Sequence, residues 1–161
     1  MEASGGKDEK QVSPRYFTLD VEIEFGETVA VGRVAGGYRS FAPVSGGSFE
    51  GPGLSGVVRP IGVDSRLRRR AGSCTASVVT VLSTDDGACI ALQCDGEGTL
   101  SGGNGTSRTD GARPSASSTL AVQCRLECGD ARYGWLDGAL AIGEARVDAD
   151  HGDYRLFVLA S

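Results

Sequence analysis

A strict alternation of apolar and polar residues in Tyr16–Phe25, YFTLDVEIEF, most constrains how this chain can fold. Phe17, Leu19, Val21 and Ile23 fall on one face of an extended segment, and hydroxyl-bearing or acidic residues fall on the other. Successive side chains of a strand point to opposite faces, so the pattern predicts a half-buried β-strand. A helix would scatter the same residues around its axis.

The rest of the chain predicts more strands and no helix. No segment repeats apolar residues at helical spacing over the dozen or so positions that a stable helix needs. Short β-like runs recur instead, separated by turn signals such as Gly36-Gly37, Gly46-Gly47 and Asp85-Asp86-Gly87. The further expected strands are 28–34, 38–44, 54–59, 74–82, 88–94, 120–127, 139–143 and 153–159.

The 25 glycines, many of them inside the expected strands, favour a closed barrel, because strand glycines permit sharp coiling and corners. For this chain of 161 residues we therefore predict an all-β fold, a single closed antiparallel β-barrel with a central ligand cavity. Residues 1–14 are small, polar and charged and predict a disordered leader, so the domain is 15–161. A Gly/Ser-rich stretch at about 97–118 predicts a flexible insertion.

Composition restricts the partners. The formal net charge is −5, which favours neither a nucleic-acid nor an anionic-membrane partner, and no run reaches the length of a membrane span. The first 14 residues lack the apolar region of a secretory signal, so we expect a cytoplasmic protein. Five cysteines are an odd set for a disulfide framework, and we expect them to be reduced and mostly buried.

The stretch 45–65, SGGSFEGPGLSGVVRPIGVDS, could be a linker, a phosphate-binding loop or bent β-structure. No helix follows it and no Gly-Lys-Ser/Thr closes it, which excludes the phosphate-binding loop. The recurring apolar residues predict bent β-structure.

This stretch resembles the most characteristic motif of the domain of unknown function 3237 family, Gly-Gly-x-Phe-Glu-Gly-Pro-x-Leu-x-Gly followed by Gly-x-Asp, here at 46–56 and 62–64. The blocks VGRVAGGYRSFAPV, STDDGACI and RYGWLDGALAIGEA are also similar, and the resemblance covers about 16–96 and 120–159. The chain departs from the family at Ser65, where an aromatic residue usually follows the aspartate.

The resemblance implies a calycin-like or allene-oxide-cyclase-like barrel with a central pocket, a homodimer, and no required cofactor or metal. Some similar members belong to natural-product pathways, where related small barrels close rings by adding a hydroxyl across an alkene (hydroalkoxylation). We therefore expect a cofactor-independent cyclase or isomerase acting on a small apolar or aromatic substrate, polyketide-like or prenylated. The alternatives are a lipocalin-like carrier of such a molecule and a barrel that only dimerises.

Catalysis through a histidine base is not expected, because the single histidine, His151, lies next to a glycine in an apparent turn. The spacings Cys89 to Cys94 and Cys124 to Cys128 do not match zinc sites, so we expect no metal.

Carboxylates and arginines remain as candidates for cofactor-free acid–base chemistry. We expect Asp64 to be the general acid, Glu50 to be the second choice, and Arg39 to hold an enolate or phenolate oxygen. Each residue has an alternative role: a turn cap for Asp64, a rim ion pair for Glu50 and a surface charge for Arg39.

Aromatic residues complete the expected site. We expect Tyr38, Phe41 and Phe49 to contact the substrate, and Tyr133 and Trp135 to form one wall from a shared strand face, with core packing as their alternative. Asp85-Asp86-Gly87 predicts a hairpin turn. The run Arg66, Arg68, Arg69 and Arg70 predicts a solvated loop, with gripping of an acidic substrate group as a second possibility.

Overall fold

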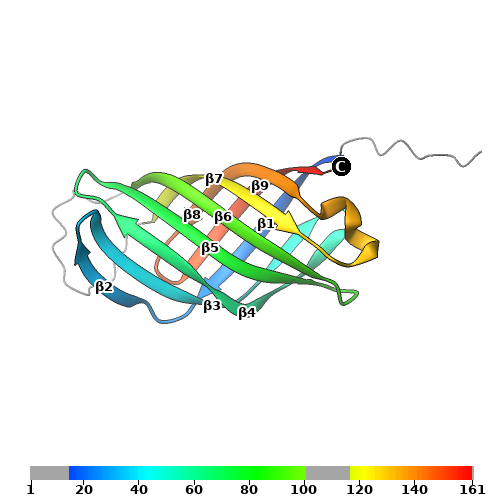
Figure 1. Cartoon of the computed structure of the whole chain (residues 1–161), viewed down its shortest axis with the longest axis horizontal. Coiled ribbons are helices and arrows are strands. Elements are labelled where there is room, and N and C mark those ends of the chain that lie inside the picture. The colour runs from blue at the N-terminus through cyan, green and yellow to red at the C-terminus, as the bar shows by residue number, and fades with distance from the viewer. Residues whose placement is uncertain (1–14, 101–116, 161) are drawn as a thin grey trace, which may run out of the picture.

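The structure, a computed structural model, describes residues 15–100 and 117–160 and consists of nine strands and one short 3₁₀ helix, η1 (Figure 1). The elements are β1 (Arg15–Phe25), β2 (Val29–Val34), β3 (Gly37–Gly51), β4 (Leu54–Arg68), β5 (Ser73–Thr84), β6 (Cys89–Leu100), β7 (Ser118–Glu127), η1 (Ala131–Leu136), β8 (Ala139–Val147) and β9 (His151–Ala160).

The strands close on themselves into a barrel. Every pairing is antiparallel, and the order runs β1-β9-β8-β7-β6-β5-β4-β3, after which β3 pairs back with β1. The short strand β2 pairs with β3 alone and lies outside this closed cycle. The predicted all-β class and closed antiparallel barrel are therefore confirmed.

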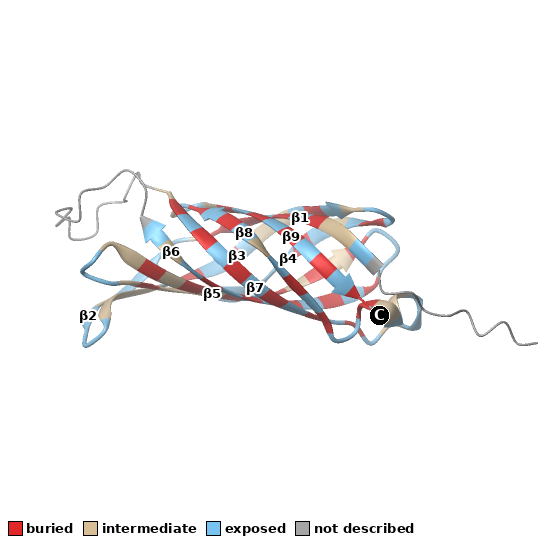
Figure 2. Cartoon of the chain, turned by 90° about the horizontal axis from the view of Figure 1, so that it is seen from above, coloured by how far each residue is buried: buried red, intermediate tan, exposed pale blue. Residues whose placement is uncertain are grey.

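Burial alternates along most strands as the period-two pattern predicts (Figure 2), with β2 and the middle of β4 as exceptions. In β1, Leu19, Val21 and Ile23 are fully buried while the residues between them are exposed. Phe17 is partly buried and packs against the same core. The apolar face therefore lines the barrel interior.

Two strands continue through positions where the sequence predicted interruptions. β3 passes through Gly46-Gly47 with an irregular register between Pro43 and Ser48, and β4 passes beyond residue 59 with an irregular register between Val58 and Gly62. A Cβ on Gly62, where φ is +103°, would collide with the backbone carbonyl of Val79. The glycines here make β-bulges inside long strands.

The predicted flexible segments fall mainly outside the described residues. The leader 1–14 lies outside them, as does 101–116 of the predicted insertion. The flanks of that insertion are strand instead, since β6 extends to Leu100 and β7 begins at Ser118. Among the residues that the structure describes, no helix is long and apolar enough to cross a membrane.

One end of the barrel is covered by η1, and there the sequence prediction was wrong. Tyr133 and Trp135 lie on this 3₁₀ helix and not on a strand. The carboxylate of Asp130 accepts a hydrogen bond from the backbone N–H of Arg132 and caps the helix. The Trp135 ring packs edge-on against Phe17 with centroids 5.7 Å apart, so η1 extends the apolar core.

Large and small apolar side chains mix along the barrel interior. Near η1, Leu54, Leu82, Ile90, Leu126 and Leu136 are buried beside Ala139 and Ala141. Towards the opposite end, at the β4–β5 and β8–β9 connections, Ala42, Ala76 and Ala145 are buried along with Phe25, Leu120 and Val147. A central cavity is not shown by this packing and stays a prediction.

The expectation of reduced cysteines is wrong for one pair. Cys94 on β6 and Cys124 on β7 are direct cross-strand partners, both buried, and they form a disulfide with a Cα–Cα separation of 4.1 Å. Strand register brought them together, which their spacing along the chain could not indicate. Cys74, Cys89 and Cys128 are free thiols.

Candidate active site

The structure places Asp64 inside the barrel. It lies on β4 two residues after the Gly62 bulge, directly opposite Ala42 of β3, and only 1% of its surface is exposed. A carboxylate this deep in an apolar wall is costly unless a partner compensates it.

Arg66 is that partner, because residues two apart on a strand share a face. Its Nε donates to Oδ2 of Asp64 at 2.5 Å, and its Nη1 donates to the backbone carbonyl of Asp148 at 2.5 Å. The guanidinium carbon lies 5.0 Å from the centre of the Phe25 ring. About a fifth of the Arg66 side chain remains exposed (21%), whereas Asp64 is only 1% exposed.

Each member of the pair keeps one buried polar atom unsatisfied. Among the described residues, neither Oδ1 of Asp64 nor Nη2 of Arg66 has a hydrogen-bond partner. Buried polar atoms in folded proteins are nearly always paired, because an unpaired one costs about 1–3 kcal/mol. Within the described residues, Asp64 thus keeps an unpaired acceptor and Arg66 an unpaired donor.

Burial raises the pKa of the Asp64 carboxyl above 3.8, and the charge and hydrogen bond of Arg66 oppose that rise. Tyr154, on the inner face of β9, is the third polar group acted on by these charges. Burial first, and then the negative charge of Asp64, raises the pKa of its phenol far above the usual 10.0. Tyr154 is therefore a neutral hydroxyl across the physiological range.

An alanine is one of the two cross-strand partners of each of these polar groups. Ala42 pairs with Asp64, Ala76 with Arg66 and Ala145 with Tyr154, while the partners on the other side are Val78, Ser40 and Val21. An alanine beside each group leaves more space over it than a leucine would. The cluster of Asp64, Arg66 and Tyr154, hereafter the inner polar cluster, is the candidate site.

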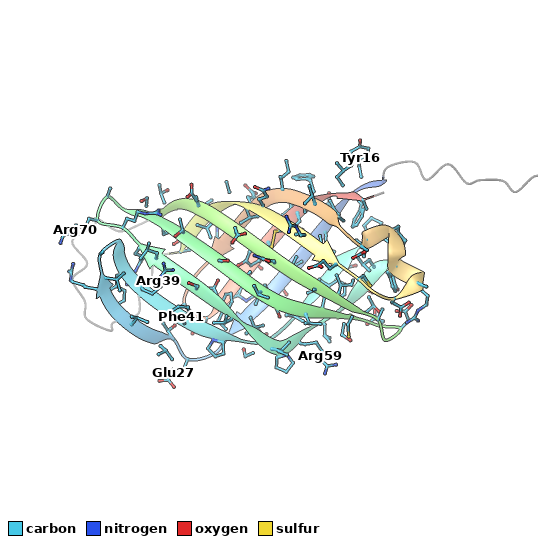
Figure 3. The ribbon with its side chains drawn as sticks, in the orientation of Figure 1. Tyr16, Glu27, Arg39, Phe41, Arg59 and Arg70 are labelled. Atoms are coloured by element: carbon cyan, nitrogen blue, oxygen red, sulfur yellow. A yellow bond between two sulfur atoms is a disulfide. The ribbon has the colours of Figure 1, made fainter. Side chains whose placement is uncertain are left out.

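Two of the predicted catalytic residues lie elsewhere. Arg39 on β3 donates from Nη1 to the hydroxyl of Ser65 at 2.9 Å, on the side of β4 opposite to Asp64, and it lines a depression of the outer surface (Figure 3). Glu50 is exposed and follows the inward-facing Phe49. The structure therefore does not bring Arg39 or Glu50 to Asp64.

Three predicted substrate-binding residues come from β3. Phe49 is buried in the interior, and Phe41 is 37% exposed on the outer face (Figure 3). Tyr38 is half-buried, and the guanidinium of Arg68 lies 5.2 Å from its ring centre. Arg66 and Arg68 belong to β4, so their predicted placement in a solvated loop is wrong.

The other two predicted binding residues lie at the opposite end of the barrel. Tyr133 donates its hydroxyl to Asp86 at 2.9 Å, and Trp135 packs on the core. The hydroxyl of Thr84 also donates to Asp86, at 2.5 Å, and these two hydrogen bonds lower the pKa of Asp86. The Asp85-Asp86-Gly87 turn therefore ties η1 to the β5–β6 hairpin.

Arg66 and Tyr154 are the members of the inner polar cluster that the sequence reasoning missed. The signal for Arg66 was present, because Asp64-x-Arg66 places opposite charges on the same face of a strand. Tyr154 gave no such signal, because only barrel closure brings β9 within reach of the charges on β4.

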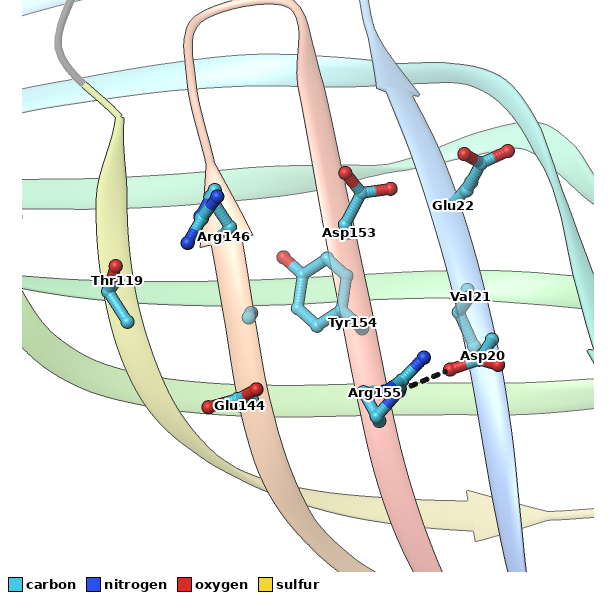
Figure 4. Close-up of a pocket in the computed structure, with 10 residues that line it drawn as sticks. Asp20, Val21, Glu22, Thr119, Glu144, Arg146, Asp153, Tyr154 and Arg155 are labelled. Carbon is cyan, nitrogen blue, oxygen red and sulfur yellow. Dashed lines mark hydrogen bonds and ion pairs between the residues drawn. The ribbon is translucent and has the colours of Figure 1, made fainter.

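Two other groupings of polar side chains lie on the outer surface. A groove of about 420 Å³ is lined by residues of β1, β7, β8 and β9. Figure 4 shows its side chains, among them Tyr154 and Arg155, and Arg155 donates to Asp20 at 3.1 Å. Beside the groove, the ligating atoms of Glu22, His151 and Asp153 lie within 4.8 Å of one another. Exposed acidic groups of this kind are common without a bound metal, so this cluster identifies no metal site.

Comparisons with known proteins identify a family and a relative of this chain. The family model described as "Protein of unknown function (DUF3237)" matches residues 15–159. UPF0311 protein RPA1785 of Rhodopseudomonas palustris is 29% identical over 136 residues, covering 83% of this chain and 87% of that protein.

Two crystal structures have the same fold at low identity. A β-barrel-like protein of Acinetobacter baumannii superposes with a TM-score of 0.74 at 23% identity, covering 91% of this chain and 96% of its own. A structure described as an enzyme from Penicillium herquei superposes with a TM-score of 0.62 at 16% identity, covering 89% and 94%.

Proposed function

The chain belongs to the DUF3237 family, and from that premise we propose that it is a cofactor-independent cyclase or isomerase that uses Asp64 for proton transfer. The proposed reaction is an intramolecular ring closure, such as addition of a phenol or alcohol hydroxyl across an alkene, in secondary-metabolite biosynthesis. The substrate is small and apolar or aromatic, of the polyketide-like or prenylated type.

One observation carries the proposal: Asp64 and Arg66 form a buried ion pair in which, across the part of the chain that the structure describes, Oδ1 and Nη2 have no hydrogen-bond partner. Such an arrangement has little value for stability, since a well-packed apolar replacement is often as stable as a buried ion pair. Strongly perturbed carboxyl groups with a specific charged partner are typical of sites that move protons.

The inner polar cluster supplies a group that can carry the proton and a group that can orient the substrate. Oδ1 of Asp64 can take a proton from an attacking hydroxyl and return it to carbon, and the raised pKa of the carboxyl helps it hold that proton in between. Tyr154 is a neutral donor that can orient an oxygen of the substrate. Holding both reacting ends of one molecule together also lowers the barrier, by up to several kcal/mol.

The experiment is to incubate the purified protein with an extract of a strain lacking its gene, with and without a metal chelator. Products are compared by mass and chiral chromatography. The proposal expects a product of unchanged mass in one enantiomer, formed equally with chelator, and lost in Asp64→Asn.

Glu50→Gln is the matched control, because it removes an exposed carboxylate of the neighbouring strand and should retain the conversion. A compound that co-purifies with the protein and emerges unaltered would instead favour the lipocalin-like carrier. Equal conversion by wild type and Asp64→Asn would remove Asp64 from the reaction.

A further inference from the structure

The two unsatisfied atoms of the inner polar cluster define what a ligand must offer. Within residues 15–100 and 117–160, Nη2 of Arg66 is a donor with no acceptor, and Oδ1 of Asp64 is an acceptor while the carboxyl is ionised. A ligand that satisfies both must carry a hydrogen-bond acceptor and a hydrogen-bond donor, as a carbonyl compound with a hydroxyl does. A simple alkene carries neither.

We infer that the substrate is a neutral conjugated carbonyl compound bearing a hydroxyl, and that Arg66 is the catalytic residue that holds its carbonyl oxygen as an enolate forms. This inference rests on the proposed function and gives it a substrate class. It also assigns to Arg66 the role that the sequence suggested for Arg39.

Charge excludes the obvious alternative of an acidic substrate. A carboxylate or phosphate that reached Nη2 of Arg66 would also face Asp64, whose charge already offsets that of Arg66. The surrounding wall is apolar, with Phe25 against the guanidinium and alanines beside the charged pair. A neutral carbonyl enters this site without a net charge, and a negative charge develops on it only during the reaction.

The reaction balances without an external reactant. Oδ1 of Asp64 takes the hydroxyl proton as the hydroxyl oxygen bonds to the β-carbon of the conjugated alkene. The alkene electrons move to form the enolate, whose oxygen accepts the Nη2 hydrogen bond of Arg66. The protonated Asp64 then returns the proton to the α-carbon, the carbonyl re-forms, and the product is an isomer of the substrate.

The test uses 4-nitrophenol, whose phenolate resembles an enolate and absorbs differently from the phenol. Asp64→Asn imitates the protonated carboxyl of the enolate stage, so it should bind the phenolate at least tenfold more tightly than wild type does. Asp64→Asn with Arg66→Gln should lose that gain, and Asp64→Asn with Arg39→Gln should keep it, because Arg39 lies on the outer face.

Equal phenolate affinity in Asp64→Asn and in the double variant Asp64→Asn with Arg66→Gln would overturn the inference. Binding of the neutral phenol by both of these variants would overturn it as well. If Asp64→Asn does not fold, wild type and Arg66→Lys are compared one pH unit below the pKa of the free probe. There the inference requires a phenolate spectrum for the probe bound to wild type, and the phenol spectrum contradicts it.

These results are separate from those of the incubation with extract. Arg66-dependent phenolate binding without any isomeric product would reject the proposed turnover while keeping the anion-holding site. An isomeric product without Arg66-dependent binding would keep the enzyme and reject this substrate class.

Discussion

Removal of the Arg66 charge should destabilise the fold by leaving a buried carboxylate without its partner. At 2.5 Å and an effective dielectric constant of about 20, the attraction between unit charges is about 7 kcal/mol before desolvation is subtracted. Loss of one partner of a buried pair typically costs about 3–5 kcal/mol. Since Arg66 is partly exposed and Asp64 can take up a proton, we expect Arg66→Gln to cost about 3 kcal/mol.

For a domain of this size, that cost lowers Tm by roughly 6–12 °C. Urea and thermal unfolding at pH 7, followed by circular dichroism, measure it. Arg39→Gln is the control and should change stability by less than about 0.5 kcal/mol.

The double variant Asp64→Asn with Arg66→Gln replaces the ion pair by two neutral amides and should recover at least half of the loss. A cost below about 1 kcal/mol for Arg66→Gln would show that Asp64 is not desolvated as its burial requires. A double variant no more stable than the single one would contradict the ion-pair explanation.

Three further predictions concern pH, the disulfide and assembly. Because burial raises the pKa of Asp64 above 3.8, the stability it contributes is present below pH 3.8 and is lost as pH rises through the folded-state pKa. Unfolding measured against pH should show this loss in wild type and not in Asp64→Asn. Replacing Cys94 and Cys124 by alanine removes a cross-link between residues 30 apart and should lower the free energy of unfolding by about 3.5 kcal/mol. Equal stability of the oxidised and the reduced wild type would refute the contribution of the disulfide. The homodimer stays a prediction, and Ile142 and Phe157 are exposed cross-strand partners on the outer face that could form its interface. If they do, the double variant Ile142→Lys with Phe157→Lys should be a monomer in sedimentation velocity. An unchanged dimer would exclude this face.

Local pattern was enough to predict the class of fold and to single out Asp64 as a candidate residue. Alternation in β1 specified which residues face inward, since a strand's side chains point to opposite faces whatever its neighbours are. The glycine-rich motif marked the bend before Asp64, because only glycine fits the bulge at Gly62 beside the carbonyl of Val79. These are properties of one strand and its immediate partner.

The partners of Asp64 across the barrel could not be predicted in the same way. Tyr154 is far from Asp64 in sequence, and the free atoms of the Asp64–Arg66 pair become significant only because closure buries them. The Cys94–Cys124 bond depends on a register between β6 and β7 that neither strand specifies alone.

The sequence by itself determined the strands, their inward faces and the bends, because these follow from backbone sterics and side-chain periodicity over a few residues. Strand periodicity already places Arg66 on the face of Asp64, but only the tertiary structure decided that Arg39, on the adjacent strand, lies on the opposite face of the barrel wall. Closure then surrounds Arg66 with apolar side chains, where the effective dielectric constant is low and its electrostatic interactions are strong. Water weakens the interactions of Arg39 on the outer face.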